Sequence, residues 1–98
     1  MADEVPSTFT VYPNYPNPFN PSTDLRYDLS VGSFVRAAVY DISGRLIKKL
    51  VSSQQTAGQK IITWSGTNDK GGAVSGGIYF CVIEAGNARQ VIKMMLVK

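Results

Sequence analysis

The sequence predicts an all-β protein built as an antiparallel sandwich. Along most of the chain, apolar and polar residues alternate with the period of two that is typical of a strand with one buried face. No segment of helical length has apolar residues at the 3.6-residue spacing of a helix. The alternating segments recur about every ten residues and are separated by turns rich in glycine, asparagine and serine, as in β-sandwiches. A barrel with the same number of strands stays open as an alternative.

Length and composition indicate one folded domain, 1–98, without a covalent or metal framework. Of the 98 residues, 44% are hydrophobic and only 17% are charged, so the chain can bury a core and does not belong to the disordered class. There is no histidine and a single cysteine, Cys81, which excludes an internal disulfide and the common zinc sites. We therefore expect no cofactor. No apolar run reaches the roughly 18 residues of a membrane-spanning helix.

The charge distribution is uneven but does not indicate a nucleic-acid partner. Residues 1–30 carry four acids and one base, whereas residues 31–98 carry three acids and nine bases. The bases are scattered along the strands and no aromatic stacking motif accompanies them. We interpret them as the solvated faces of strands.

Three strands are predicted in the first 41 residues. Residues 1–22 form a lead-in rich in proline and asparagine that includes a short edge strand at 9–12. Residues 23–29 and 33–41 alternate cleanly, and the side chains expected to face the core are Leu25, Tyr27, Leu29, Val35, Ala37 and Val39. Because only a short turn separates these two segments, we expect them to pair as a hairpin.

An irregular strand is predicted at residues 45–51. Ile47 and Leu50 lie three positions apart, so they share a face only if the strand contains a bulge or stops pairing. This irregularity favours an edge position. Lys48 and Lys49 would discourage other chains from adding to that edge.

A strand with the only tryptophan follows a predicted loop at residues 54–58. In residues 60–64 the alternation places Ile62 and Trp64 on the inward face. Five of the nine glycines lie in the next loop, 65–77. We expect Trp64 to be the largest packing group of the core.

The last two strands are predicted at residues 77–84 and 88–98. The first is apolar on both faces, which indicates a central strand and makes Cys81 a buried, inert thiol. The inward residues are Tyr79, Cys81, Ile83, Ile92, Met94 and Leu96. With the earlier segments, these strands make a seven-stranded antiparallel sandwich of the immunoglobulin-like type.

The outward faces of these two strands combine into an apolar patch. Either the N-terminal segment covers it or it docks a partner, and we expect docking. A contact between copies of the chain is the alternative. The apolar patch consists of Ile78, Phe80, Val82, Val91, Met95 and Val97.

The stretch YPNYPNPFNPST, residues 12–23, contains four prolines and three asparagines. Each proline removes a hydrogen-bond donor and makes the preceding residue extended, so the stretch cannot be a central strand. Asparagine side chains can hold such a segment rigid without a ladder. We expect it to run over the surface or along an edge, with Tyr15 and Phe19 inserted into one end of the sandwich.

Motifs for catalysis and metal binding are missing from the sequence. Asp24 and Asp28 share an outward strand face but lie about 13 Å apart, too far for a glycosidase pair. The run at Asn68 to Gly72 lacks the alternating acids of a calcium loop and is better explained as a glycine-rich turn. We therefore expect a protein that is not an enzyme.

Several motifs together resemble one family, the C-terminal sorting domains (type A) of proteins exported by the bacterial type IX secretion system. They are YPNPFNPST at 15–23, the VYDISGR turn at 39–45, SGGIYF at 75–80 and the terminal KMMLVK. The resemblance covers nearly the whole chain. Any one of these motifs alone would be weak.

The resemblance implies a signal that carries an N-terminal cargo domain through the periplasm and across the outer membrane. The implied partners are the translocon and its sortase-like processing machinery, and the implied location is the cell surface or the extracellular space. Signal elements transferred from the family are Tyr15, Pro16, Asn17, Pro18, Phe19, Asn20, Pro21, Gly44, Gly77, Tyr79, Lys93 and Lys98. For Gly44, Gly77 and Tyr79 a folding role explains the residue equally well.

The long loop after Trp64 departs from the commonest short form of that family. It is similar instead to the immunoglobulin-like domain of flagellar hook-capping proteins, which has a comparable W-x-G loop. A structural or adhesive spacer is therefore the alternative function. A natural precursor in which more protein follows the domain would favour the spacer.

Overall fold

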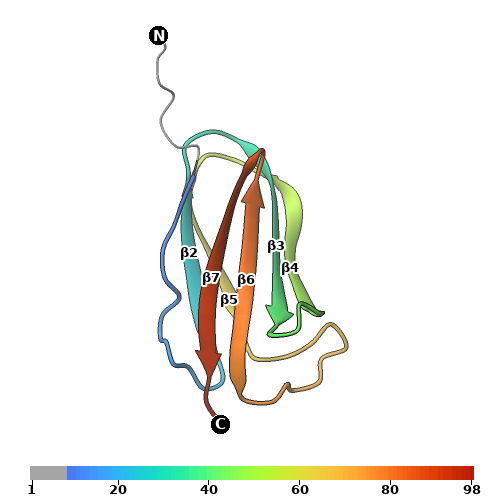
Figure 1. Cartoon of the computed structure of the whole chain (residues 1–98). Coiled ribbons are helices and arrows are strands. Elements are labelled where there is room, and N and C mark those ends of the chain that lie inside the picture. The colour runs from blue at the N-terminus through green and yellow to red at the C-terminus, as the bar shows by residue number, and fades with distance from the viewer. Residues whose placement is uncertain (1–8) are drawn as a thin grey trace.

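The computed structural model describes residues 9–98 and consists of two antiparallel sheets packed face to face (Figure 1). One sheet has the strand order β1–β2–β5 and the other has the order β4–β3–β6–β7. The strands are β1 (Phe9–Val11), β2 (Thr23–Leu29), β3 (Ser33–Asp41), β4 (Leu46–Gln55), β5 (Gly58–Trp64), β6 (Gly77–Ala85) and β7 (Ala88–Leu96). The seven-stranded antiparallel sandwich predicted from the sequence is confirmed. Residues 1–8 of the predicted lead-in lie outside the described residues.

The predicted hairpin between residues 23–29 and 33–41 is wrong. β2 pairs with β1 and β5, whereas β3 pairs with β4 and β6 in the other sheet. The chain therefore crosses between the sheets after Leu29 (Figure 1). Both strands turn their apolar residues toward the same interior from opposite sides. Alternation is the same for a hairpin and for such a crossover, so the local pattern could not distinguish them.

Side chains of the predicted inward faces fill the space between the sheets. All of them are buried except Ile92, which is half-buried at the margin of the core. The Trp64 ring lies between two other aromatic rings, with centroid distances of 5.6 Å to Phe19 and 5.2 Å to Tyr79. Its indole N–H donates a 2.9 Å hydrogen bond to the Thr67 carbonyl, so its polar atom is satisfied within the core.

β4 is an irregular edge strand, as the sequence predicted. Its register with β3 shifts twice. The two β4 residues that have no paired residue on β3 are Leu50 and Ile47. Both half-buried side chains pack against the core. The two bulges therefore bring residues three positions apart to the same face, which a regular strand cannot do.

The connection between β4 and β5 is shorter than predicted, because β4 continues to Gln55 and β5 begins at Gly58. The hydroxyl of Tyr27 in β2 donates a hydrogen bond to Oε1 of Gln55. This contact links the end of β4 to the opposite sheet. Burial raises the pKa of Tyr27, and the bond to Gln55 partly opposes that shift.

β6 is a central strand between β3 and β7, as predicted. Cys81 lies at its middle and is fully buried. Burial raises the pKa of the thiol to about 12, which keeps it protonated at neutral pH. No helix in the described 90 residues is long and apolar enough to cross a membrane.

Candidate functional site

The segment rich in proline and asparagine joins the two sheets at the end of the sandwich where the described chain ends (Figure 1). Tyr15 exchanges two backbone hydrogen bonds with Asp24 of β2, at 3.0 and 2.9 Å. Four residues later, the Phe19 N–H donates to the Met95 carbonyl and the Phe19 carbonyl accepts from the Val97 N–H, both at 2.9 Å. The predicted path along the surface and an edge is confirmed.

The side chain of Asn17 acts as an additional peptide group on the open edge of β7. Its Oδ1 accepts a 3.0 Å hydrogen bond from the Met95 N–H, and its Nδ2 donates a longer one of 3.5 Å to the Lys93 carbonyl. These backbone groups would otherwise be free to pair with another strand. Asn17 therefore covers the edge of β7 with its side chain, whereas the backbone of the segment bonds to this strand two residues later, at Phe19.

Side-chain hydrogen bonds also fix the beginning of the segment. Asn14 is 4% exposed, and its Nδ2 donates to Oγ1 of Thr23 at 3.0 Å. The Thr23 hydroxyl donates in turn to the Pro16 carbonyl at 2.8 Å. The peptide bonds before Pro16, Pro18 and Pro21 are cis. The predicted role of asparagines in holding this segment without a ladder is confirmed for Asn14 and Asn17.

Of the two aromatic residues that were predicted to insert into the sandwich, only one does so. Phe19 is 2% exposed and packs on Trp64, as predicted. Tyr15 is 76% exposed, so its predicted insertion is wrong. Tyr15 pairs with Asp24 as an extended residue, and alternation along the backbone then turns its ring to solvent.

The turn between β3 and β4 is organised by Asp41, a residue that the sequence analysis did not single out. Its Oδ1 accepts hydrogen bonds from the backbone N–H and hydroxyl of Ser43 and from the Arg45 N–H, at 2.7 to 3.0 Å. Gly44 has a φ of 88°, where a side chain would be strained. This supports the folding explanation for Gly44. An aspartate followed by serine and glycine was the signal available in the sequence.

The stability of the domain is expected to fall in acid through Asp41. Hydrogen bonds from Ser43 and then Arg45 lower its pKa from 3.8 to about 2. A lowered folded-state pKa gives stability that is present above pH 4 and lost as the pH falls toward 2. Melting temperatures between pH 5 and 2 should therefore decline less steeply in Asp41→Asn than in the unmodified protein, with Ser43→Ala between them. An unchanged slope in Asp41→Asn would contradict this role.

The loop of residues 65–76 protects the other edge of the four-stranded sheet. The Asp69 N–H donates to the Ile47 carbonyl at 3.0 Å, and the Asp69 carboxylate accepts from the Lys49 N–H at 2.9 Å. Asn68 organises the turn, since its Oδ1 accepts from the N–H groups of Lys70 and Gly72. Within residues 9–98 no cluster of three metal-ligating side chains occurs. The glycine-rich turn is thus an edge cover.

Two further positions transferred from the family, Gly77 and Tyr79, lie where β6 begins. The Tyr79 hydroxyl donates a 2.6 Å hydrogen bond to the Ser75 carbonyl, and the ring packs on Trp64. Gly77 has a φ of 148°. A Cβ on Gly76 would lie 3.1 Å from the Leu96 carbonyl oxygen, so the loop and the last strand approach closely. Folding therefore accounts for Gly77 and Tyr79.

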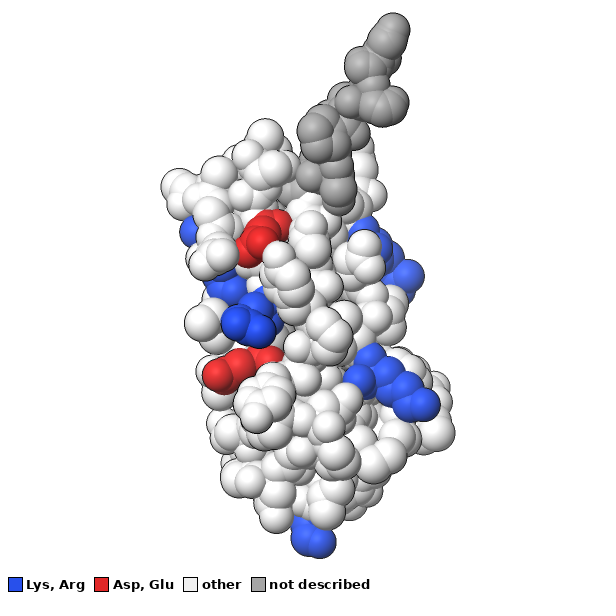
Figure 2. All heavy atoms as spheres, turned by 90° about the vertical axis from the view of Figure 1, so that its left-hand side faces the viewer, with Lys and Arg blue, Asp and Glu red and all other residues white. Residues whose placement is uncertain are grey.

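Most of the predicted signal elements are brought to this one end of the sandwich. Residues 15–21 border β7, Gly77 pairs with Leu96, and Asp41 before the Gly44 turn pairs with Tyr79. Lys93 lies farther along β7, opposite Phe80. Residues 12–23 contain no charged side chain, and the corresponding side of the molecule is largely uncharged at this end, apart from a basic group at its tip (Figure 2).

The structure places the residues of the apolar patch on the outer face of β6 and β7, with Val97 directly after the end of β7. Ile78 is opposite Met95, and Val82 is opposite Val91. Val91, Met95 and Val97 are 41 to 47% exposed, whereas the three residues from β6 are half-buried. Asn17 and Pro18 lie beside a shallow depression at Ile78 and Met95. The N-terminal segment thus borders one end of the patch, and docking on the remainder stays a prediction.

Comparison with known proteins supports the fold and identifies a family. The model of the FlgD Ig-like domain matches residues 22–89, more than half of the chain. No curated protein has a sequence that matches significantly.

Similar solved structures share the fold at low identity. Latent PorU from Porphyromonas gingivalis, crystallised as a dimer, has a TM-score of 0.70 and 21% identity over 99% of this chain and 10% of its own. FlgD from P. aeruginosa has a TM-score of 0.60 and 23% identity over 76% and 58%. PorZ, an essential surface component of the type IX secretion system of Porphyromonas gingivalis, has a TM-score of 0.62 and 21% identity over 90% and 11%.

This chain therefore spans about a tenth of PorU and of PorZ, and somewhat more than half of FlgD. The predicted immunoglobulin-like type of the sandwich is confirmed, and so is the predicted likeness to hook-capping proteins. The chain belongs to the family of FlgD Ig-like domains.

Proposed function

We propose that this domain is a non-enzymatic sorting signal, which directs an N-terminal cargo protein across the outer membrane by the type IX secretion system and to the cell surface. The observation that carries the proposal is the placement of the family motifs. YPNPFNP, the Gly44 turn and the start of SGGIYF border one end of the sandwich, together with the last residues of KMMLVK. The fold shared with PorZ, a component of that secretion system, supports the same conclusion.

The exposed residues at this end are the ones that we propose a translocon reads. Tyr15 is 76% exposed, while its bonds to β2 come from the backbone and do not need the ring. Lys93 and Lys98 are exposed as well. The apolar patch beside them is the surface that we propose for docking to the translocon or to the cargo domain.

The test appends residues 1–98 to a secreted reporter in a bacterium that has the type IX system. We expect the reporter at the cell surface, with loss of surface signal in Tyr15→Ala/Lys93→Ala/Lys98→Ala and in Phe80→Glu/Met95→Glu. Gln59→Ala on the opposite sheet is the control and should be exported normally. Because Met94 and Leu96 are buried, deletion of the last six residues would unfold the domain, so exposed positions are the better test.

Two results would overturn the proposal. One is retention of the unmodified fusion in the periplasm, and the other is equal surface display in a strain without the translocon.

The second candidate, a structural or adhesive spacer, is favoured by the family match to FlgD Ig-like domains. A spacer would leave the location of the reporter unchanged in every variant.

A further inference from the structure

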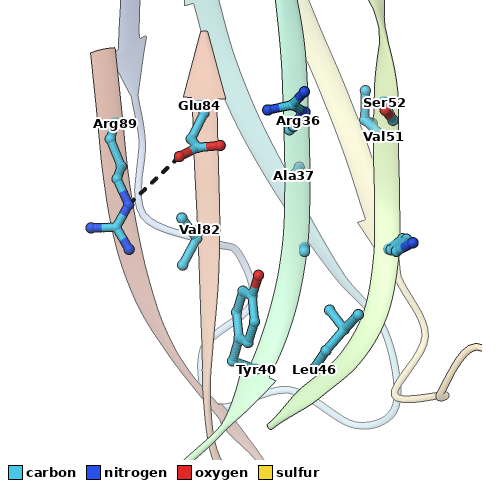
Figure 3. A pocket seen from close by; sticks show the side chains of 11 residues that line it. Arg36, Ala37, Tyr40, Leu46, Val51, Ser52, Val82, Glu84 and Arg89 are labelled. Atoms are coloured by element: carbon cyan, nitrogen blue, oxygen red, sulfur yellow. Dashed lines mark ion pairs between the residues drawn. The ribbon is translucent and has the colours of Figure 1, made fainter. Parts of the chain in front are cut away.

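The outer face of the four-stranded sheet carries a hollow in which apolar and basic side chains meet (Figure 3). The hollow has a volume of about 300 Å³, and β3, β4, β6 and β7 all contribute to its lining. A second depression adjoins it and shares Tyr40, Val82 and Arg89. Together they form a shallow trough across the sheet, which overlaps the apolar patch at Phe80 and Val82.

A small side chain explains why the sheet is hollowed at this point. Ala38 faces outward between Arg36 and Tyr40 and is opposite Val82 on β6. The longer side chains around it rise above the sheet, whereas a methyl group does not. Leu46 lies opposite Tyr40 on β4 and is 42% exposed, so it forms an apolar wall. Ala38 and Val82 form the floor of the hollow. This floor and the wall formed by Leu46 suit a large apolar side chain.

The rim of the hollow is strongly basic. Arg36, Lys49 and Arg89 line it, and Glu84 is the only acidic side chain among the lining residues. Glu84 forms an ion pair with Arg89 at 3.9 Å and also lies opposite Arg36. The Arg36 guanidinium lies over the Phe34 ring, 5.4 Å from its centre. Three cations against one carboxylate leave an excess of positive charge for a ligand.

The opposite face of the sandwich lacks this excess. On the outer surface of β2, Asp24 and Asp28 flank the single cation Arg26. The Tyr12 hydroxyl donates to the Asp28 carboxylate at 2.6 Å, and Arg26 lies 6.0 Å from the centre of the Tyr12 ring. One cation between two carboxylates leaves no positive excess on this strand, so the two faces differ in the ligand charge that they would accept.

The spacing of the basic groups favours an extended peptide. Arg89 and Lys93 lie four positions apart on one face of β7, which corresponds to about 13 Å. In an extended peptide, two acidic residues four positions apart have the same spacing as Arg89 and Lys93. An apolar residue midway between them would lie beside Val91 and its neighbour Val82 on β6. Arg36 and Arg89 are separated by β6, about 10 Å at the usual spacing between strands, so they do not converge on a single phosphate.

We propose that this hollow binds an extended acidic segment of a partner protein, in which two carboxylates flank a large apolar side chain. The apolar side chain fills the space over Ala38 and Val82. One carboxylate contacts Arg89 at the rim of the hollow, and the other contacts Lys93, which lies farther along β7. Arg36, across β6, adds to the positive charge without contacting the same carboxylate. The proposal goes beyond the sorting role and does not depend on it, because a spacer domain would present the same face.

The test uses the purified chain and the peptide acetyl-GESFSEG-amide, followed by amide chemical shifts in an NMR titration. We expect saturable shifts confined to β3, β4, β6 and β7, and about tenfold weaker binding of Arg36→Gln/Arg89→Gln. Ala38→Leu should fill the hollow and weaken binding severalfold as well. The matched control is Arg26→Gln on the other sheet, which should bind as the unmodified chain does.

Control ligands separate this proposal from general charge attraction. The peptide acetyl-GKSFSKG-amide should not bind, and acetyl-GESASEG-amide should bind severalfold more weakly. Equal binding of the lysine peptide, shifts on β2 and β5, or no saturable shift up to about 10 mM peptide would overturn the proposal. So would binding to vesicles that contain anionic lipid without binding to the peptide. None of these results bears on export of the reporter, so the two proposals fail separately.

Discussion

Replacement of Trp64 by alanine is expected to lower the free energy of unfolding by about 3 to 5 kcal/mol. The side chain is 1% exposed, and its ring contacts Phe19 from the lead-in and Tyr79 from β6. Alanine would leave a cavity where the two sheets and the Pro/Asn segment meet, and it would also remove the hydrogen bond to Thr67. Domains of this size typically have only about 5 to 15 kcal/mol of stability, so a large part would be lost.

The measurement is unfolding in urea, observed by circular dichroism, since the substitution removes the only tryptophan fluorophore. Trp64→Phe retains an aromatic ring and should cost clearly less than Trp64→Ala. Ile61→Ala is a matched control on the same strand, because this side chain is 64% exposed and should change stability by about 0.5 kcal/mol or less. A midpoint in Trp64→Ala equal to that of the unmodified protein would show that the ring is not a core residue.

Phe19→Ala is expected to destabilise the domain by about 3 to 5 kcal/mol although residue 19 lies in no strand. Its ring is 2% exposed and packs on Trp64, and its backbone bonds to Met95 and Val97. Loss of the ring should therefore release the segment from the edge of β7 as well as open the core. Faster hydrogen exchange at the Met95 and Val97 amides would report this release directly.

Tyr15→Ala is the matched control for Phe19→Ala, because both are aromatic residues of the same short segment. Tyr15 is 76% exposed, so its removal should cost no more than about 0.5 kcal/mol. Comparable losses from the two substitutions would contradict the orientation of the segment. Because Phe19 and Trp64 are in contact, the double variant should lose less than the sum of the single losses.

The alternation of apolar and polar residues along the chain was enough to predict which segments are strands and which side chains face the core. In β2 and β3 the alternation placed Leu25, Tyr27, Val35 and Val39 correctly, because a strand exposes successive side chains on opposite sides. Even the irregularity of β4 was visible in the spacing of Ile47 and Leu50. These features depend on neighbours along the chain and not on the partner strand.

Pairing between strands could not be predicted in the same way. The connection after Leu29 crosses between the sheets, yet its length and polarity would also suit a hairpin. Tyr15 was wrongly placed in the core, because an aromatic residue between prolines carries no signal of which way the backbone turns it. In each case the deciding contact lies on a distant part of the chain.

In the candidate site, too, local motifs could be predicted from the sequence, whereas contacts between distant segments could not. The motifs were recognised in the sequence, but Asn17 as a cover for the edge of β7 and Asp69 as a cover for the edge of β4 depend on contacts with segments 20 or more residues away. The hollow around Ala38 likewise needs four strands in register, since β3, β4, β6 and β7 each contribute residues to its lining.

Alternation and proline geometry act within a few residues, so the strands, their buried faces and the stiffness of the segment rich in proline and asparagine could be predicted from the sequence. The three-dimensional structure was needed to establish which strands share a sheet, which aromatic residue of that segment enters the core, and that distant motifs meet at one end. Those outcomes depend on hydrogen bonds and packing between residues far apart in the chain, which no local pattern encodes.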